Sequence, residues 1–166
     1  AGTAQASDFA AFVSANEATA AARFAIIDAA GRERYSVSRV ASGQAAVVEQ
    51  QYDAAGRVVG AYAFNTTLPV DASLSSTLSQ GSATESSLAG FAAANRATAQ
   101  IQRMVYDSAG RIAYTIDGAG GVTSTRYNAI GEVASVRRHA QAVGLGLAGT
   151  TLDAAQVAST LTETAQ

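Results

Sequence analysis

Hydrophobic positions along the chain follow two different periods. Apolar residues recur at i, i+3 and i+4 at Phe9, Phe12 and Val13, which predicts one face of a helix that begins after Ser7. The same spacing follows Ser87, with Leu88, Phe91 and Ala92. Short helices are also expected at 71–78, just after the sole proline, Pro69, and at 152–161. Between the helical segments the pattern alternates, which predicts strands at 23–26, 35–37, 47–52, 58–64, 103–106, 114–116, 122–127 and 133–136.

Four turn segments share one pattern, with Asp or Asn first and glycine fourth. The first side chain can accept a hydrogen bond from the backbone two residues on, and glycine adopts φ > 0 without a Cβ clash. The pattern therefore predicts bulged hairpin turns, with further loops at 42–43 and 118–121 at the opposite ends of the hairpins. The turn residues are Asp28 and Gly31, Asp53 and Gly56, Asp107 and Gly110, and Asn128 and Gly131.

The chain contains an internal duplication. The segment 8–35 matches 87–114 at a constant offset of 79 residues, so that Phe12 corresponds to Phe91, and the match resumes at an offset of 75, where Tyr52 corresponds to Tyr127. We therefore predict two tandem modules, 1–82 and 83–166. The expected fold is a β-rich α+β repeat protein of antiparallel hairpin meanders, with about four strands per module and short flanking helices.

The same turns resemble those of a known family. Tyr-Asp, two further residues and Gly-Arg stand at 52–57 and at 106–111, and a second glycine and tyrosine follow at Gly120 and Tyr127. In these residues the chain resembles the YD-repeat (RHS) family over 20–63 and 99–136, with Tyr52, Tyr106 and Tyr127 as the repeat tyrosines. It departs from the family at Ile27, Asn128 and Glu132, which replace Tyr, Asp and Arg, and its helical segments interrupt a normally continuous array.

The resemblance implies a long, curling antiparallel sheet that is a structural part of a large extracellular or cell-surface bacterial protein. We expect such a unit to stack end to end with neighbouring copies into an array, fibre or tube. The sequence between the two modules, near 79–91, resembles the sequence obtained by joining residue 166 to residue 1. We therefore expect the two ends of the chain to correspond to a boundary between neighbouring repeats of that array. The alternatives are a carbohydrate- or surface-binding adhesin module, which exposed tyrosines would favour, and a fragment of a toxin-encapsulating shell.

The amino-acid composition argues against several other classes of function. Only 14% of the residues are charged and the net charge is −2, so neither nucleic acid nor an anionic membrane surface is an expected partner. No run of residues is long and apolar enough for a membrane span. The absence of cysteine and the single histidine, His139, remove most catalytic and metal-binding constellations. We expect no enzyme and no cofactor, and we assign no catalytic, cofactor-binding or metal-ligating residue.

Three motifs carry weaker signals and are interpreted as structural. The segment 144–149 matches a dinucleotide-binding fingerprint without the strand–turn–helix context that this motif needs. Asp117 opens a glycine-rich loop that lacks the further carboxylates of a calcium site. His139 is expected to be a solvated loop residue, and no histidine stands near a nucleophile elbow to form a catalytic triad.

Overall fold

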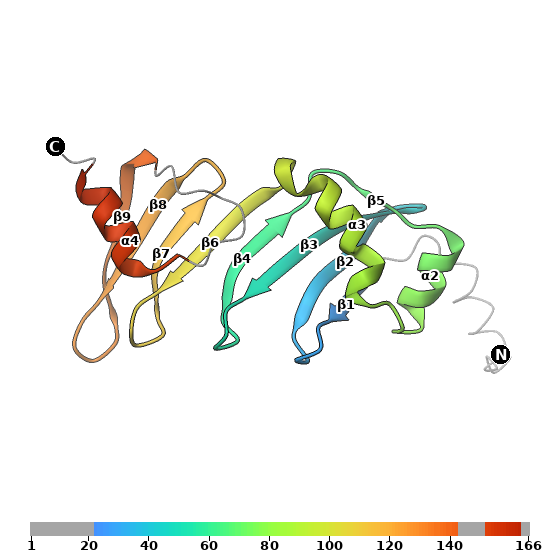
Figure 1. The fold of residues 1–166 in the computed structure, drawn as a ribbon, viewed down its shortest axis with the longest axis horizontal. Coiled ribbons are helices and arrows are strands. Elements are labelled where there is room, and N and C mark those ends of the chain that lie inside the picture. The colour runs from blue at the N-terminus through green and yellow to red at the C-terminus, as the bar shows by residue number, and fades with distance from the viewer. Residues whose placement is uncertain (1–21, 143–151, 164–166) are drawn as a thin grey trace, which may run out of the picture. The chain divides into compact units, whose positions relative to one another are not determined.

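The computed structural model describes residues 22–142 and 152–163. The predicted N-terminal helix with Phe9, Phe12 and Val13 and the glycine-rich segment 144–149 lie outside these residues. The described part is mostly antiparallel β-sheet with three α-helices and one 3₁₀ turn (Figure 1). Its strands are β1 (Arg23–Ile27), β2 (Glu33–Ala41), β3 (Gln44–Tyr52), β4 (Val58–Ala63), β5 (Leu68–Pro69), β6 (Gln100–Tyr106), β7 (Ile112–Asp117), β8 (Gly121–Tyr127) and β9 (Val133–Ala142). Its helices are α2 (Ala72–Ser79), α3 (Glu85–Asn95), α4 (Ala154–Glu163) and η1 (Arg96–Thr98).

All eight strands predicted from alternation are present, and the short strand β5 is an addition. Pro69 lies in β5, just ahead of α2 as predicted. Asp71 is the N-cap of α2 and accepts a hydrogen bond from the Leu74 backbone N at 2.7 Å. Helix α3 begins one turn earlier than predicted, with Thr84 as its N-cap. Ser87 is then the third helical residue, and its hydroxyl accepts from the Thr84 backbone N at 3.2 Å.

The described residues belong to two compact units, each discontinuous in sequence. Of the described residues, the first unit comprises 22–49 and 64–98, and the second comprises 50–63, 99–142 and 152–163. The boundary passes through β3, so these units do not coincide with the modules 1–82 and 83–166 of the sequence repeat. The tandem-module organisation stays a prediction.

In the first unit, β1, β2 and β3 pair in antiparallel register. The register places Phe24 opposite Val37, and Val37 opposite Val47. Because side chains alternate between the two faces of a strand, those of Val37 and Val47 both point into the core, and each residue is 1% exposed. Helix α3 contributes Leu88, which is fully buried, while Phe91 is partly buried and makes an edge-to-face contact with Phe64 at 5.3 Å between ring centroids. Burial of this helix face is therefore complete at Leu88 and partial at Phe91.

In the second unit, β4, β6, β7, β8 and β9 follow one another in antiparallel pairing. Val105, Ile116 and Val122 point from three neighbouring strands onto Val157 of α4, and all four are at most 1% exposed. The repeat offsets relate Val105, Ile116 and Val122 to Ile26, Val37 and Val47 of the first unit, which are buried to the same degree.

Candidate functional site

The predicted turn residues occupy hairpin turns with one repeated hydrogen-bond arrangement. In each turn the side chain of the first residue accepts bonds of 2.8–3.1 Å from the backbone N–H groups of the third and fifth residues. The glycine at the fourth position has φ between 79° and 88°, in the left-handed region that favours glycine. These turns have Asp28, Asp53, Asp107 and Asn128 first and Gly31, Gly56, Gly110 and Gly131 fourth.

The fifth residue of three turns adds a salt bridge to the first. Arg32, Arg57 and Arg111 each direct Nε and Nη2 at the second carboxylate oxygen of the turn aspartate, at 2.7–2.9 Å. The backbone N–H of this arginine and its guanidinium hold the pKa of Asp28, Asp53 and Asp107 below the usual value. In the fourth turn an amide-to-carboxylate hydrogen bond replaces the salt bridge, since Asn128 Nδ2 donates to Glu132 Oε2 at 3.0 Å.

The glycine-rich loop after Asp117 is a fifth turn of the same kind. Asp117 Oδ1 accepts from the backbone N of Ala119 at 3.0 Å and of Gly121 at 2.8 Å, and Gly120 has φ 82°. Here the arginine comes from another strand, since Arg138 Nη2 lies 3.3 Å from Asp117 Oδ2. The carboxylate is thus occupied by protein donors, and no group of three metal-ligating side chains occurs within residues 22–142 and 152–163.

Two of the repeat tyrosines link consecutive turn arginines to the sheet. The guanidinium carbon of Arg57 lies 4.4 Å from the centroid of the Tyr106 ring, and the Tyr106 hydroxyl donates to the backbone O of Val58 at 2.7 Å. We call this arrangement of turn arginine, stacked tyrosine and following carbonyl the hairpin connector. A second hairpin connector repeats it with Arg111 over Tyr127 at 4.4 Å and the Tyr127 hydroxyl 3.0 Å from the O of Ile112.

Tyr52 makes a different hydrogen bond, since its hydroxyl donates to Gln50 Oε1 at 2.8 Å. It lies at the end of β3 and is partly buried, as Tyr106 and Tyr127 are at the ends of β6 and β8. All three repeat tyrosines therefore lie at strand ends with their hydroxyl groups engaged by the protein.

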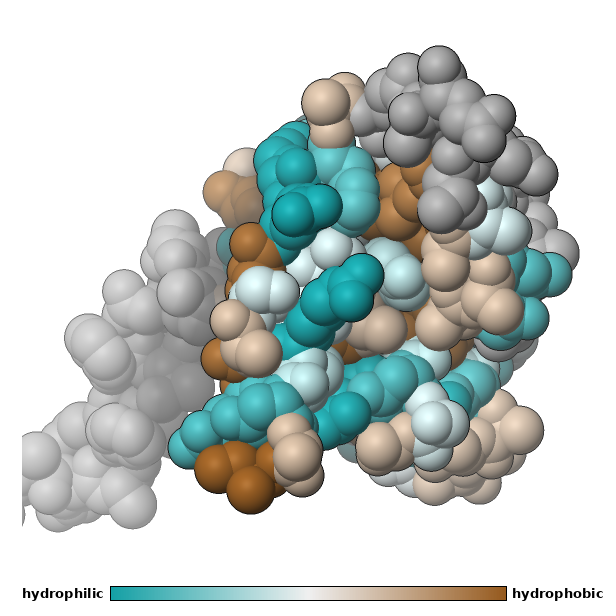
Figure 2. Space-filling view, turned by 90° about the vertical axis from the view of Figure 1, so that its left-hand side faces the viewer, coloured by the Kyte–Doolittle hydropathy of each residue, from teal (hydrophilic) through white to brown (hydrophobic). Residues whose placement is uncertain are grey.

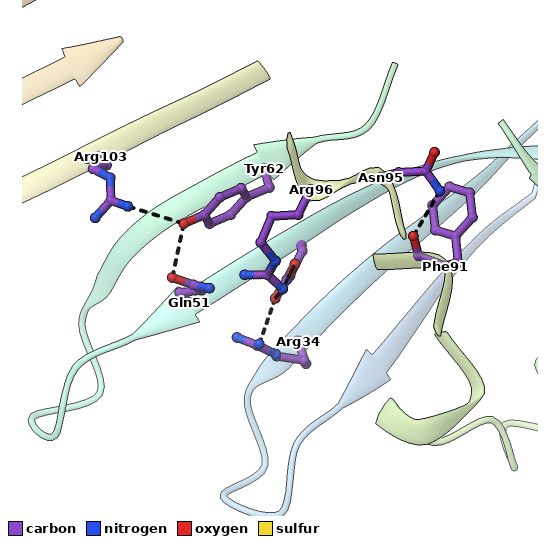
Figure 3. A network of polar contacts seen from close by, with 8 residues as sticks. Arg34, Gln51, Tyr62, Phe91, Asn95, Arg96 and Arg103 are labelled. Carbon is purple, nitrogen blue, oxygen red and sulfur yellow. Dashed lines mark hydrogen bonds and ion pairs between the residues drawn. The ribbon is translucent and has the colours of Figure 1, made fainter. Parts of the chain in front are cut away.

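The first unit holds a fully buried carboxylate that sequence analysis missed (Figure 3). Strand β3 places Glu49 opposite Tyr35, and Glu49 has no exposed surface. Arg34 Nη2 lies 2.6 Å from Glu49 Oε1, and Arg96 Nη2 lies 2.8 Å and 2.7 Å from the two carboxylate oxygens. Burial raises the pKa of the Tyr35 hydroxyl, and the charge of Glu49 raises it further. The available signal was the inward position of Glu49, two residues after buried Val47 in an alternating strand.

The second unit holds a separate polar cluster, with residues from the end of β3, from β4 and from β6 (Figure 3). The Tyr62 hydroxyl donates to Gln51 Oε1 at 3.3 Å and accepts from Arg103 Nη2 at 3.4 Å. Gly60 lies opposite Arg103, and a Cβ at Gly60 would come within 3.3 Å of the Tyr62 ring. The glycine thus leaves room for a buried ring that holds the arginine.

A cavity of about 500 Å³ lies in the second unit between α4 and strands β7, β8 and β9. His139 lines it and contacts Ser124, with 3.0 Å between Nε2 and Oγ. The expectation of a solvated loop histidine is wrong, because β9 continues to Ala142 instead of ending at Val136 and His139 is partly buried within it. The remaining lining residues are Ala113, Tyr114, Thr125, Arg126, Arg137, Ala158 and Leu161.

Comparison with known proteins finds no matching family model and no matching curated protein. The resemblance to the YD-repeat family therefore rests on the turns and tyrosines described above. Among the helices of the described part, none is sufficiently long and apolar to span a membrane.

Proposed function

We propose that the protein is a structural repeat unit of a large extracellular or cell-surface bacterial protein of the YD-repeat type, and that it stacks end to end with neighbouring copies. The hairpin connector is the observation that carries this proposal. It uses the Tyr-Asp-x-x-Gly-Arg residues to join one hairpin to the next, and it occurs twice with the same stacking distance. The resemblance to YD repeats supports the cellular setting.

The polar groups of the connector are engaged within the protein. The carboxylate of Asp53 binds two backbone N–H groups and Arg57, while Arg57 also stacks on Tyr106. The Tyr106 hydroxyl donates to a backbone carbonyl, as does that of Tyr127 in the second connector. A recognition site would leave such groups available to a ligand, whereas a structural motif satisfies them internally. This arrangement favours an architectural role for the motif.

The edge strands offer a way for one copy to pair with the next. Within the described residues β1 pairs only with β2, and β9 pairs only with β8. Strand β9 is ten residues long and exposes Val133 (57%) and Val136 (64%). Figure 2 shows the side of the molecule that carries β9 and α4, where brown hydrophobic patches lie among teal hydrophilic and pale intermediate residues. An unpaired strand with exposed β-branched side chains is a template for pairing with another chain.

The first and last turns lack half of a connector. Ile27 stands where a stacked tyrosine would be, and Glu132 stands where the stacking arginine would be. A junction between copies would therefore depend on strand pairing and apolar contact. Exposed Ile27 (48%) and Ile130 (80%) lie at these two turns and are available for such contact.

Sedimentation velocity over a range of protein concentrations, with negative-stain microscopy, tests this proposal. We expect elongated assemblies that grow with concentration, and Val136→Lys on β9 should suppress them because a charged edge opposes strand addition. Val40→Lys is the matched control, because Val40 is 56% exposed but lies on β2, which is paired on both sides, with β1 and β3. A monodisperse monomer at high concentration, together with a parent polypeptide that carries only this pair of modules, would contradict the proposal.

A further inference from the structure

Two exposed arginines lie on the neighbouring strands β8 and β9 of the second unit. Arg126 and Arg137 have no carboxylate partner among the described residues. By contrast, seven of the eleven arginines form salt bridges with Asp or Glu. These seven are Arg23, Arg32, Arg34, Arg57, Arg96, Arg111 and Arg138.

The strand register brings the two arginines together. Arg126 of β8 lies opposite Ser135, and Arg137 of β9 lies opposite Ser124. The arginines are therefore diagonal neighbours on one face of an antiparallel pair, and both line the cavity beneath α4. Diagonal positions are about 7–8 Å apart along the backbone, so the two long, exposed side chains can reach one bound anion together.

The rest of the lining suits a polar anionic ligand. None of the described residues that line the cavity is acidic. Ser124 and His139 offer hydrogen-bonding side chains, while Tyr114 and Leu161 offer apolar surface. The volume of about 500 Å³ is in the range of small-molecule sites. Ser124 Oγ and His139 Nε2 lie 3.0 Å apart at the cavity wall.

We propose that this cavity binds a small hydroxylated anion, the class that includes sugar acids and sugar phosphates. Arg126 and Arg137 hold the oxyanion, because a planar guanidinium matches carboxylate and phosphate oxygens with two parallel hydrogen bonds. Ser124 and His139 bind ligand hydroxyl groups, and Tyr114 provides a face for the sugar ring. The site does not depend on end-to-end assembly, since all of its residues belong to the second unit.

Titration of the ¹⁵N-labelled full chain, followed by ¹H–¹⁵N correlation spectra at low salt, tests this site. The ligands are glucuronate, glucose 6-phosphate, neutral glucose and inorganic phosphate. We expect saturable shifts at residues 124–126 and 137–139 with at least one of the two sugar anions and not with glucose. A response to glucuronate alone identifies a carboxylate ligand, and a response to glucose 6-phosphate alone identifies a phosphate ligand.

Substitutions then assign the binding to the arginine pair. Arg126→Gln and Arg137→Gln should each weaken binding about tenfold, as loss of a charged hydrogen-bond donor does. Arg138→Gln is the matched control, since it removes the same charge from the same strand but from a side chain that pairs with Asp117. Equal weakening by Arg138→Gln would overturn the site. So would equal affinity for glucose, no saturable response to either sugar anion, or an affinity for inorganic phosphate equal to that for the sugar anions.

Discussion

Arg96 Nη2 lies 2.7 Å from Oε2 of Glu49, although the two residues are 47 positions apart in the chain. The contact ties the turn after α3 to strand β3. Arg34 supplies a second guanidinium to the same carboxylate, and Glu49 is fully buried. A carboxylate without solvent depends on such partners, because an unpaired buried charge is strongly unfavourable.

Arg96→Met should therefore lower the free energy of unfolding by about 3 kcal/mol, since it leaves the buried carboxylate with one arginine. Urea denaturation followed by circular dichroism measures this loss. Arg23→Met is the control, because it removes an arginine from a pair whose arginine side chain is 59% exposed. Such a pair is worth less than about 1 kcal/mol. Equal losses for the two variants would show that burial of Glu49 does not set the energetic importance of Arg96.

The turn aspartates predict a decrease in stability at low pH. Their pKa values are below normal in the folded protein, so Asp28, Asp53 and Asp107 bind protons more readily when the chain is unfolded. Protons then favour the unfolded chain, and the stability that these groups contribute decreases as pH falls below about 4 and is lost below the folded pKa. Urea midpoints measured between pH 7 and pH 2 follow this loss.

Asp107→Asn isolates one turn, and the natural turn at Asn128 shows that the amide fits the same hydrogen bonds. The variant should be less stable than the parent at pH 7, because it loses the pair with Arg111. The difference should shrink as pH falls, since protonation removes the same pair from the parent. Parallel pH profiles for the two proteins would argue against a depressed pKa at Asp107.

Local sequence predicted the hairpins because strand alternation and Asp-x-x-Gly turns depend on neighbouring residues alone. Gly31, for example, lies at φ 80° in the turn that its spacing from Asp28 predicts. The strand β5 escaped prediction because two residues carry no period, and it exists through pairing with Gln44 and Ala45 of β3.

Candidate sites were not predictable in this way, because register and helix packing assemble them from distant segments. Neither Glu49 with Arg96 nor Arg126 with Arg137 is adjacent in sequence or related by a local spacing. Whether His139 lies in a strand or in a loop depends on how far β9 continues beyond its apolar residues, and the apolar pattern does not show this. A strand that remains paired through Arg137 and Arg138 does so because β8 lies beside it.

Glycine conformation predicts opposite effects at two positions of the first unit. A Cβ at Gly31 meets no atom within 4 Å, so Gly31→Ala tests the left-handed backbone alone and should cost about 1–2 kcal/mol. Gly90 has equally open space but lies within α3. Gly90→Ala should therefore stabilise the protein by about 0.5–1 kcal/mol. Thermal unfolding of the two variants measures both, and an unchanged stability for Gly31→Ala would contradict the strained turn.

The hairpin connector predicts energetic coupling between Arg57 and Tyr106. Tyr106→Phe keeps the ring but removes the 2.7 Å hydrogen bond to the O of Val58, which should cost about 1 kcal/mol. Burial raises the pKa of Tyr106, so the hydroxyl group remains a donor across the neutral pH range. Arg57→Met removes the stacked guanidinium and the pair with Asp53. A double-mutant cycle of Arg57→Met with Tyr106→Leu separates the stacking contribution, which should be about 0.5–1 kcal/mol at this partly exposed site.

The second connector provides the internal comparison. Arg111 and Tyr127 have the same 4.4 Å stacking distance, so their cycle should give a coupling energy of the same sign and similar size. Arg57 with Tyr127 is the mismatched cycle, because each of these residues stacks on a different partner, and its coupling should be near zero. Equal coupling in matched and mismatched cycles would mean that the Tyr-Asp-x-x-Gly-Arg residues stabilise their own turns without joining one hairpin to the next.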